Sequence, residues 1–247
     1  MLKLCVIIFA QNETESLFNT FNRILTISQD EKMRGVIQEV FVIDDGSETK
    51  NQKIISAFFN DFKLKTEFDL YFLSQNPKGI SKTVSETLAK SKDNVNSVLP
   101  LPGHDMFDTN SIYKLIESSA ADELSIGFRS NLWSERPILK YISAKILTLF
   151  YRLLVFPKII DAHGLYIFPI EIARKYISPH GGHEILILPL YMALKNGVKV
   201  NQIPINLKEG HLVESYRLGR SKRTRLPHII SSIKCLTLII KDKFNLS

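Results

Sequence analysis

The sequence predicts an α/β fold in which helices cover both faces of a mostly parallel sheet. Short, continuous apolar runs alternate along the chain with segments whose apolar residues recur at helical spacing. Continuous apolar runs are typical of strands that are buried on both faces, as in a parallel sheet. Their regular alternation with helical segments is typical of β-α-β units. The chain of 247 residues contains no internal repeat and no low-complexity linker, so we expect a single domain.

The expected strands are the apolar runs, and the expected helices are the periodic segments between them. We predict strands at residues 4–9, 40–43, 70–73, 98–101, 124–129, 165–168 and 198–205. We predict helices around residues 17–25, 80–88, 112–116, 138–156, 184–194 and 229–240.

The predicted helix 138–156 is strongly apolar, but Lys140, Lys145 and Arg152 interrupt it. A membrane-spanning helix needs about 20 mostly apolar residues, and a charge at its centre costs kilocalories. We therefore expect an amphipathic helix that packs on the sheet, with a position on a membrane surface as the alternative.

The excess of positive charge is local. The net charge is +7, and the stretch 216–225 is dense in basic residues and has no acidic one. Such a patch suits a polyphosphate, a nucleic acid or an anionic membrane. Nucleic acid is the weaker candidate because the chain has no zinc-ligand spacing and no RNA-binding signature.

The N-terminus and the cysteines indicate a reducing compartment. Met1–Ala10 has no small-residue cleavage pattern and is interpreted as a strand, so we expect a cytoplasmic protein. Cys5 and Cys235 each lie in an apolar run, which favours buried free thiols over a disulfide.

The apolar run 98–101 ends in Pro and Gly and places His104, Asp105 and Asp108 in the following loop. In α/β proteins, chemistry is found just past the carboxyl ends of the strands. The alternative is a turn in which Asp105 or Asp108 caps the next helix.

A second acidic pair, Asp44 and Asp45, lies on a tight Gly turn after the strand 40–43. Two carboxylates at this place can accept hydrogen bonds from a base or a ribose. They can also simply stabilise the bend as an Asx-turn. The Gly-rich dinucleotide fingerprint is absent after the first strand, and no P-loop sequence occurs, so both of those nucleotide sites are disfavoured.

Four separated segments, taken together and in order, resemble the family 2 glycosyltransferases of the GT-A fold. The resemblance is closest to the polyprenyl-phosphate sugar transferases of the dolichyl-phosphate mannose synthase type. Val6-Ile7-Ile8-Phe9-Ala10-Gln11-Asn12-Glu13 is similar to the family's opening strand and P-A-Y-N-E turn, and Val42-Ile43-Asp44-Asp45-Gly46-Ser47 is similar to its V-D-D-G-S. Ile126-Gly127-Phe128-Arg129 resembles its V-G-S-R, and Arg217-Leu218-Gly219-Arg220-Ser221-Lys222 resembles its R-x-x-G-x-S-K. The resemblance implies one glycosyltransferase domain over 1–247. Within it, residues 1–130 would bind the nucleotide-sugar, and residues 131–247 would bind the acceptor and carry a C-terminal basic and amphipathic segment.

The resemblance also implies roles for individual residues, each with a structural turn or a solvated charge as its alternative. The donor nucleotide is expected to contact Ala10, Asn12, Glu13, Asp44, Asp45, Gly79 and Lys82. Its diphosphate is expected at Arg217, Ser221 and Lys222, and an acceptor phosphate at Arg129, Arg136 and Ser143. The candidate catalytic residues are Asp105, Asp161 and Glu184, and the candidate ligands of Mn²⁺ or Mg²⁺ are Asp105 and His104.

The chain departs from the family at the D-x-D metal motif, which aligns with Gly103-His104-Asp105. The first Asp is replaced by Gly, and Phe107 stands where this branch tends to have Gln. Hard cations prefer oxygen ligands, so a nitrogen from His104 would tilt the site toward Mn²⁺. The other readings are that Asp108 completes the site, that basic residues of 217–222 neutralise the diphosphate with less help from metal, or that catalysis has been lost.

The mechanism that the resemblance implies is an inverting displacement at the anomeric carbon of the sugar. A lipid phosphate acceptor is already anionic and needs no strong base, whereas a saccharide hydroxyl needs one, for which Asp161 and Glu184 are the candidates. Leu139 stands where the branch often has an Arg, so both acceptor classes stay open. The expected partners are a nucleotide-sugar donor, one of these acceptors and, peripherally, the anionic inner face of the membrane.

Two other classes of function compete with a glycosyltransferase. The missing first Asp of the D-x-D motif favours a non-catalytic GT-A module that binds nucleotide or a partner transferase. A sugar nucleotidyltransferase shares the sheet architecture, but it carries a Gly-rich loop with Arg after the first strand. The sequence here is Phe9-Ala10-Gln11-Asn12, so we rank this hypothesis last.

Overall fold

Within the part of the chain that the structure describes, seven strands form one sheet with the N-terminal strand near its centre. The computed structural model describes residues 1–62, 66–135, 138–161, 163–177, 187–210 and 236–243, without the side chains of 139, 140, 143 and 154. The strand order is β3-β2-β1-β4-β6-β5-β7. The strands are β1 (Leu4–Ala10), β2 (Ile37–Asp45), β3 (Asp69–Gln75), β4 (Ser97–Pro102), β5 (Glu123–Arg129), β6 (Leu165–Pro169) and β7 (Lys199–Ile205).

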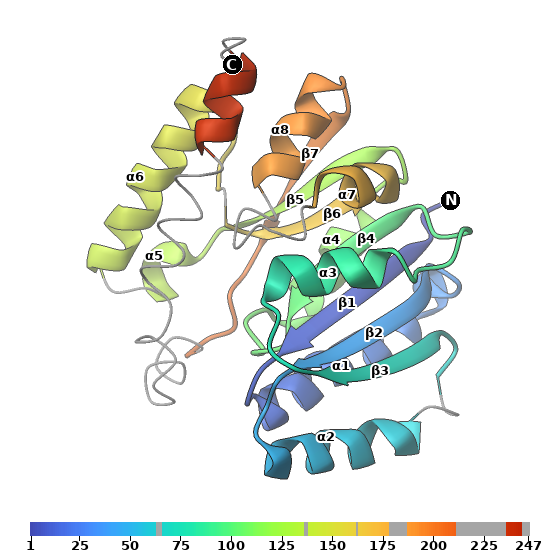
Figure 1. The fold of residues 1–247 in the computed structure, drawn as a ribbon. Helices are drawn as coiled ribbons and strands as arrows, with labels where there is room; N and C mark the ends of the chain where they lie inside the picture. The colour runs from blue at the N-terminus through green and yellow to red at the C-terminus, as the bar shows by residue number, and fades with distance from the viewer. Residues whose placement is uncertain (63–65, 136–137, 162, 178–186, 211–235, 244–247) are drawn as a thin grey trace.

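Helices follow most of the strands and lie on both faces of the sheet (Figure 1). The named α-helices are α1 (Thr14–Ser28), α2 (Thr49–Phe62), α3 (Ile80–Leu88), α4 (Thr109–Glu117), α5 (Leu132–Glu135), α6 (Ile138–Leu154), α7 (Ile170–Tyr176) and α8 (Ile187–Lys195). A 3-10 turn covers Glu31–Met33, and residues 236–243 are also helical.

The sheet is mostly parallel, as predicted. β1 is parallel to β2 and β4, β2 to β3, and β5 to β7. β6 runs antiparallel to both of its neighbours, β4 and β5. The predicted fold class, a mostly parallel sheet with helices on both faces in a single domain, is therefore confirmed.

The side chains of β1 alternate between two cores, one on each face of the sheet. Leu4, Val6 and Ile8 face one core, and Cys5 and Ile7 face the other, because successive strand residues point to opposite faces. Helices α1, α2 and α4 close the first core, and α3, α7 and α8 close the second. Cys5 is a buried free thiol, as predicted, and burial raises its pKa.

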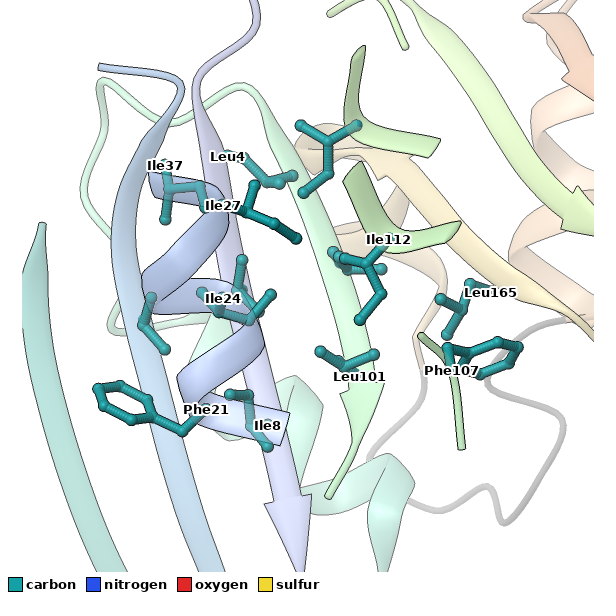
Figure 2. Packing of buried hydrophobic residues seen from close by; sticks show 14 of the residues in the cluster. Leu4, Ile8, Phe21, Ile24, Ile27, Ile37, Leu101, Phe107, Ile112 and Leu165 are labelled. Atoms are coloured by element: carbon teal, nitrogen blue, oxygen red, sulfur yellow. The ribbon is translucent and has the colours of Figure 1, made fainter. Parts of the chain in front are cut away.

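Figure 2 shows how α1 covers the first core. Phe21, Ile24 and Ile27 lie one helical turn apart on the buried face of α1, over Leu4 and Ile8 of β1. These side chains are essentially inaccessible to water. The packing fixes α1 against the sheet, so the turn that joins β1 to α1 has a defined place at the carboxyl edge of β1.

The predicted elements are present with small shifts at their ends. The described parts of the predicted helices 184–194 and 229–240 correspond to α8 and to the segment 236–243, and the predicted strand 198–205 is β7. Three of the named helices were not predicted, α2, α5 and α7. In α2 the buried Ile55 and Phe59 are four residues apart, which is helical spacing that the sequence does display.

Helix α6 packs on the domain through one side and leaves an apolar stripe uncovered. Thr148 and Tyr151 are buried, which confirms the predicted packing for that side of the helix. The other side carries large apolar side chains that are each about half exposed or more, namely Ile138, Ile142, Ile146, Leu149, Phe150 and Leu153. Among the described residues, no helix is both long and apolar enough to span a membrane.

Candidate functional site

The carboxyl ends of β1, β2 and β4 meet at one edge of the sheet. Ala10 is paired with Asp44 across β1 and β2, and Phe9 with Pro102 across β1 and β4. The turns after these strands therefore lie side by side, and each of α1, α2 and α4 begins within a few residues of its strand. Helix N-termini favour anions because their first N–H groups and the helix dipole point outward. This edge is thus the place in the fold best suited to a phosphorylated ligand.

Asp44 is fully buried and shapes the turn after β2. Its Oδ1 accepts a hydrogen bond from the backbone N–H of Ser47 at 3.0 Å, and its Oδ2 accepts one from the Ser74 hydroxyl at 3.1 Å. Gly46 has φ of +85°, and a Cβ at this position would lie 2.3 Å from Cγ of Pro77. The Asx-turn alternative is therefore realised for Asp44, and a contact with the donor stays a prediction.

Asp45 is half-buried and holds the turn that leads into α3. Its Oδ1 accepts hydrogen bonds from Nε2 of Gln75 and from the backbone N–H of Lys78, both at 2.9 Å. Its Oδ2 accepts from the backbone N–H of Gly79 at 2.9 Å. Gly79 has φ of +82° and is the N-cap residue of α3. Asp45 and Gly79, both predicted to contact the donor, are thus brought together, with Asp45 bound to the protein's own backbone.

Asn12 connects the turn after β1 with the start of α2. Its backbone N–H donates to Oγ of Ser47 at 2.7 Å, and its Oδ1 accepts from the backbone N–H of Glu48 at 2.8 Å. The Nδ2 of Asn51 donates to the same Oδ1 at 3.3 Å. Asn12 has φ of +56°, a conformation that Asn tolerates better than most residues. The predicted donor residues after β1 and β2 are therefore neighbours, and Asn12 ties the turn after β1 to Glu48, the residue before α2.

The other predicted donor residues lie around the same edge. Ala10 is buried and lies directly against Gly103. A Cβ placed at Gly103 would be only 2.9 Å from Cβ of Ala10. The backbone carbonyl of Glu13 accepts the first hydrogen bond of α1, from Leu17 N–H at 2.8 Å. Lys82 is exposed on α3, with its Nζ 4.0 Å from a carboxylate oxygen of Glu86.

Asp105 is buried, and both of its carboxylate oxygens are bound by cations of this chain. Nε of Arg23, on α1, lies 2.7 Å from Oδ1, and Nζ of Lys208, just after β7, lies 2.6 Å from Oδ2. Its backbone N–H donates to Oγ1 of Thr20 at 3.1 Å, and Asp105 has φ of +51°. In this arrangement Asp105 joins α1 to the turn after β4 and to the segment after β7.

The two candidate metal ligands, Asp105 and His104, are adjacent residues on the turn after β4. No group of three His, Cys, Asp or Glu side chains placed to hold a metal ion exists among them. His104 is half-buried beside Asp105, and Asp108 caps α4, since its Oδ1 accepts from the Ser111 N–H at 2.6 Å. The capping alternative is thus confirmed for Asp108. The prediction that Asp105 binds a divalent cation does not fit its two ion pairs.

Arg129, the last residue of β5, and Asp161 form a buried ion pair. Nε and Nη2 of Arg129 donate to the two carboxylate oxygens of Asp161 at 2.6 and 2.8 Å, and the side chains are 2% and 8% exposed. Burial raises the pKa of Asp161, but the hydrogen bonds and the charge of Arg129 more than offset this and lower that pKa to about 2. A carboxylate with such a low pKa is a weak general base. The geometry therefore disfavours Asp161 as a base and Arg129 as a ligand of an acceptor phosphate.

Two glycines explain why these residues meet. Gly127 of β5 and Gly164, just before β6, are in direct backbone contact, because a Cβ at Gly164 would lie 1.7 Å from the carbonyl oxygen of Gly127. The close approach lets the two strands pair from Gly127 and Leu165 onward. Gly127 and Gly164, one in each of the segments 126–129 and 161–164, thus allow the close backbone packing of these segments.

A small cavity lies beside this pair, between β5 and α6. It is lined by Arg129, Asp161, Thr148 and Lys145, among others, and has a volume of about 20 Å³. That is room for roughly one water molecule, and too little for a phosphate group.

The remaining predicted residues lie outside the described part of the chain. These are Arg136, Glu184, Arg217, Ser221 and Lys222, together with the side chain of Ser143. Their roles stay predictions. The sequence reasoning missed Arg23 and Lys208 at Asp105, as well as Gln75 and Ser74 at the acidic turn. None of these has a sequence signal of its own, because each meets its partner only through the fold.

Comparison with known proteins identifies the fold but no family. No protein-family model matches the chain, and no curated protein does. Glucosyl-3-phosphoglycerate synthase from Mycobacterium tuberculosis, solved with UDP, superposes with a TM-score of 0.63 at 15% identity, over 96% of this chain and 80% of that one. GalNAc-T7, solved with UDP, GalNAc and Mn²⁺, gives 0.54 at 16% identity, over 84% of this chain and 44% of that one.

A third structure shows that this fold is shared by another class of enzyme. 4-Diphosphocytidyl-2C-methyl-D-erythritol synthase from Anaerococcus prevotii superposes with a TM-score of 0.53 at 10% identity, over 89% of this chain and 99% of that one. At these identities the likeness establishes the GT-A-type α/β fold. Function has to be argued from the site.

Proposed function

We propose that this protein is an inverting glycosyltransferase that moves a sugar from a UDP- or GDP-sugar to a polyprenyl phosphate or a saccharide, in the synthesis of a cell-surface glycan or glycolipid. The observation that carries the proposal is the carboxyl edge of the sheet. There the turns 10–13, 44–48, 77–79 and 103–105 lie together, tied by hydrogen bonds of Asn12 and Asp45. Ligands of open α/β sheets bind at this edge.

The donor is proposed to lie across these turns. The base would contact Asp45, which is only half-buried and whose carboxylate can accept a further hydrogen bond. The diphosphate would lie toward the N-termini of the helices and toward Arg217, Ser221 and Lys222. These roles rest on the resemblance of the sequence motifs, and the proximity of Asn12, Asp45 and Gly79 supports them.

Of the two proposed acceptor classes, a phosphate requires fewer catalytic groups than a saccharide hydroxyl. A phosphate oxygen is already anionic and needs no general base. Asp161, one of the two candidate bases, is engaged by Arg129, and the other, Glu184, lies outside the described residues. Because Arg129 is also engaged, Lys145, exposed on α6 beside the small cavity, is a better candidate among the described residues for a phosphate contact.

A peripheral contact with the inner face of a membrane is proposed through α6 and α5. The exposed apolar stripe of α6 continues at Trp133 of α5, which is 65% exposed and packs edge-to-face on Tyr141. Helix α6 has no acidic residue, and Lys145 and Arg152 are exposed on it. Apolar residues with flanking bases and an interfacial Trp suit a surface of anionic lipid.

One observation favours the second candidate function, a non-catalytic GT-A module that binds nucleotide or a partner transferase. The carboxylate at the D-x-D position, Asp105, is bound by Arg23 and Lys208. A carboxylate held in this way is not placed to bind a metal. The module would bind nucleotide without turning over a donor.

The test is incubation of the purified protein with a panel of UDP- and GDP-sugars and polyprenyl phosphate, with and without Mn²⁺. A glycosyltransferase releases UDP or GDP and forms a glycosylated lipid. Nucleotide binding without any release of UDP or GDP would establish the module instead. Release of pyrophosphate from UTP and a sugar phosphate would show a nucleotidyltransferase and contradict the proposal.

A further inference from the structure

The position of the first D-x-D carboxylate has no free space for a side chain in this structure. Gly103 is buried, and its backbone N–H donates to the carbonyl oxygen of Phe9 at 2.9 Å. A Cβ at Gly103 would lie 2.9 Å from Cβ of Ala10 and 3.0 Å from that same carbonyl oxygen. Neither atom belongs to the flexible end of a side chain, so the backbones of β1 and β4 would have to separate. The glycine is therefore built into the packing of the sheet.

The second carboxylate of the motif, Asp105, is ion-paired with two cations, so the cluster carries a net positive charge. Asp105 is 5% exposed and faces Nε of Arg23 at 2.7 Å and Nζ of Lys208 at 2.6 Å. One carboxylate against two cations leaves one positive charge on these three side chains. A divalent cation would have to displace an ammonium or guanidinium group and enter a site that is already positive. The cluster therefore excludes a metal and itself attracts an anion.

The two cations differ in how they are held. The guanidinium of Arg23 also donates to Oγ1 of Thr109 at 2.9 Å, and its side chain is 22% exposed. The side chain of Lys208 is 36% exposed. Its backbone N–H donates to the carbonyl oxygen of Met106 at 2.9 Å, which fixes Lys208 beside the turn 103–105. Lys208 is thus the accessible cation, and Arg23 positions Asp105.

We propose that the nucleoside diphosphate binds at this edge without a divalent metal, and that the ammonium of Lys208 supplies positive charge to the diphosphate. This inference rests on the proposed function, since it assumes that the protein binds a nucleotide-sugar. The ammonium of Lys208 lies against Asp105, the carboxylate that aligns with the second Asp of the D-x-D motif. This ion pair already restrains the lysine side chain, so little side-chain entropy is lost when a phosphate binds.

The test compares UDP with uridine, with and without metal, by titration calorimetry on the full-length protein. The dissociation constant of UDP is expected to change less than twofold between 1 mM Mn²⁺ and excess EDTA. Adding the protein to a solution of Mn²⁺ and UDP is expected not to lower the Mn²⁺ EPR signal further than UDP alone does. Lys208→Met is expected to weaken UDP about tenfold and leave uridine unchanged, and Lys208→Arg is expected to retain most of the affinity for UDP.

Lys32→Met is the matched control, because Lys32 is 74% exposed and lies on a distant turn. Its affinity for UDP should equal that of the wild type. Stronger UDP binding with Mn²⁺ by tenfold or more, or a further loss of the Mn²⁺ signal when the protein is added to Mn²⁺ and UDP, would overturn the metal-free site and leave the proposed function standing. An equal loss of UDP and uridine binding in Lys208→Met would assign Lys208 a structural role only. If neither UDP nor GDP binds under any condition, the proposed function fails, and the inference fails with it.

Discussion

Replacing Asp161 by Asn should destabilise the protein at neutral pH and have a smaller effect in acid. The carboxylate is 8% exposed and is bound by two donors of Arg129. Its pKa is lowered from 3.8 to about 2 in the folded protein. At 1.36 kcal/mol per pKa unit, ionisation of Asp161 contributes about 2 kcal/mol to the free energy of unfolding at pH 7. For a chain of this length, that corresponds to a melting temperature lower by about 4–8 °C.

The pH dependence follows from the sign of the shift. Because the pKa is lower in the folded state, the contribution is complete above about pH 5 and is lost as the pH falls toward 2. Urea unfolding of the wild type and Asp161→Asn at pH 7 and pH 3 measures it. The exposed Asp122→Asn is the control and should have little effect at either pH. Equal stability of wild type and Asp161→Asn at pH 7, or a difference that grows in acid, would refute the reasoning.

Three further predictions concern other parts of the fold. Asp108→Ala removes the side-chain cap of α4 and should lower the free energy of unfolding by about 1 kcal/mol, whereas Asp108→Asn should restore most of it; equal losses in urea unfolding would contradict the capping role. Gly103→Ala introduces a Cβ 2.9 Å from Ala10 and should cost about 1–3 kcal/mol in the same assay, and an unchanged midpoint would show that the two strands separate freely. Leu149→Glu with Leu153→Glu should reduce sedimentation with anionic vesicles at least tenfold, while the exposed Ile54→Glu on α2 should not; equal sedimentation of all three proteins would remove α6 as the membrane contact.

The fold could be predicted because its strands and helices have recognisable local patterns of apolar residues. The run Leu4–Ala10 is continuously apolar, and β1 is buried on both faces. The direction of β6 could not be predicted, because a run of five apolar residues is equally compatible with a parallel and an antiparallel strand. The antiparallel β6 was therefore visible only in the structure.

The sequence predicted which turns lie at the carboxyl edge of the sheet, but not how their side chains are hydrogen-bonded. The acidic turn 44–47 and the turn after β4 do meet at one edge, as parallel strands require. The partners of Asp105 lie 82 and 103 residues away, and no pattern in the sequence links them. Tertiary pairing thus decides whether a carboxylate in a motif is available to a ligand.

The same limit applies to Arg129 and Asp161, which were predicted to serve an acceptor and now form a buried pair. The segments 126–129 and 161–164 match family motifs, yet in this chain they fix each other through Gly127 and Gly164. A motif match records residue types and spacing, and it does not say which of two charged residues bind each other.

Backbone amide mapping by NMR with added UDP or GDP tests the central claim most directly, because it reports where a nucleotide binds without assuming turnover. We predict chemical-shift changes at Asn12, Asp45 and Gly79, whose backbones line the carboxyl edge of the sheet. Gly35 and Asn96, which precede β2 and β4 at the opposite edge, should not respond. Changes confined to that opposite edge, or none at millimolar nucleotide, would contradict the account.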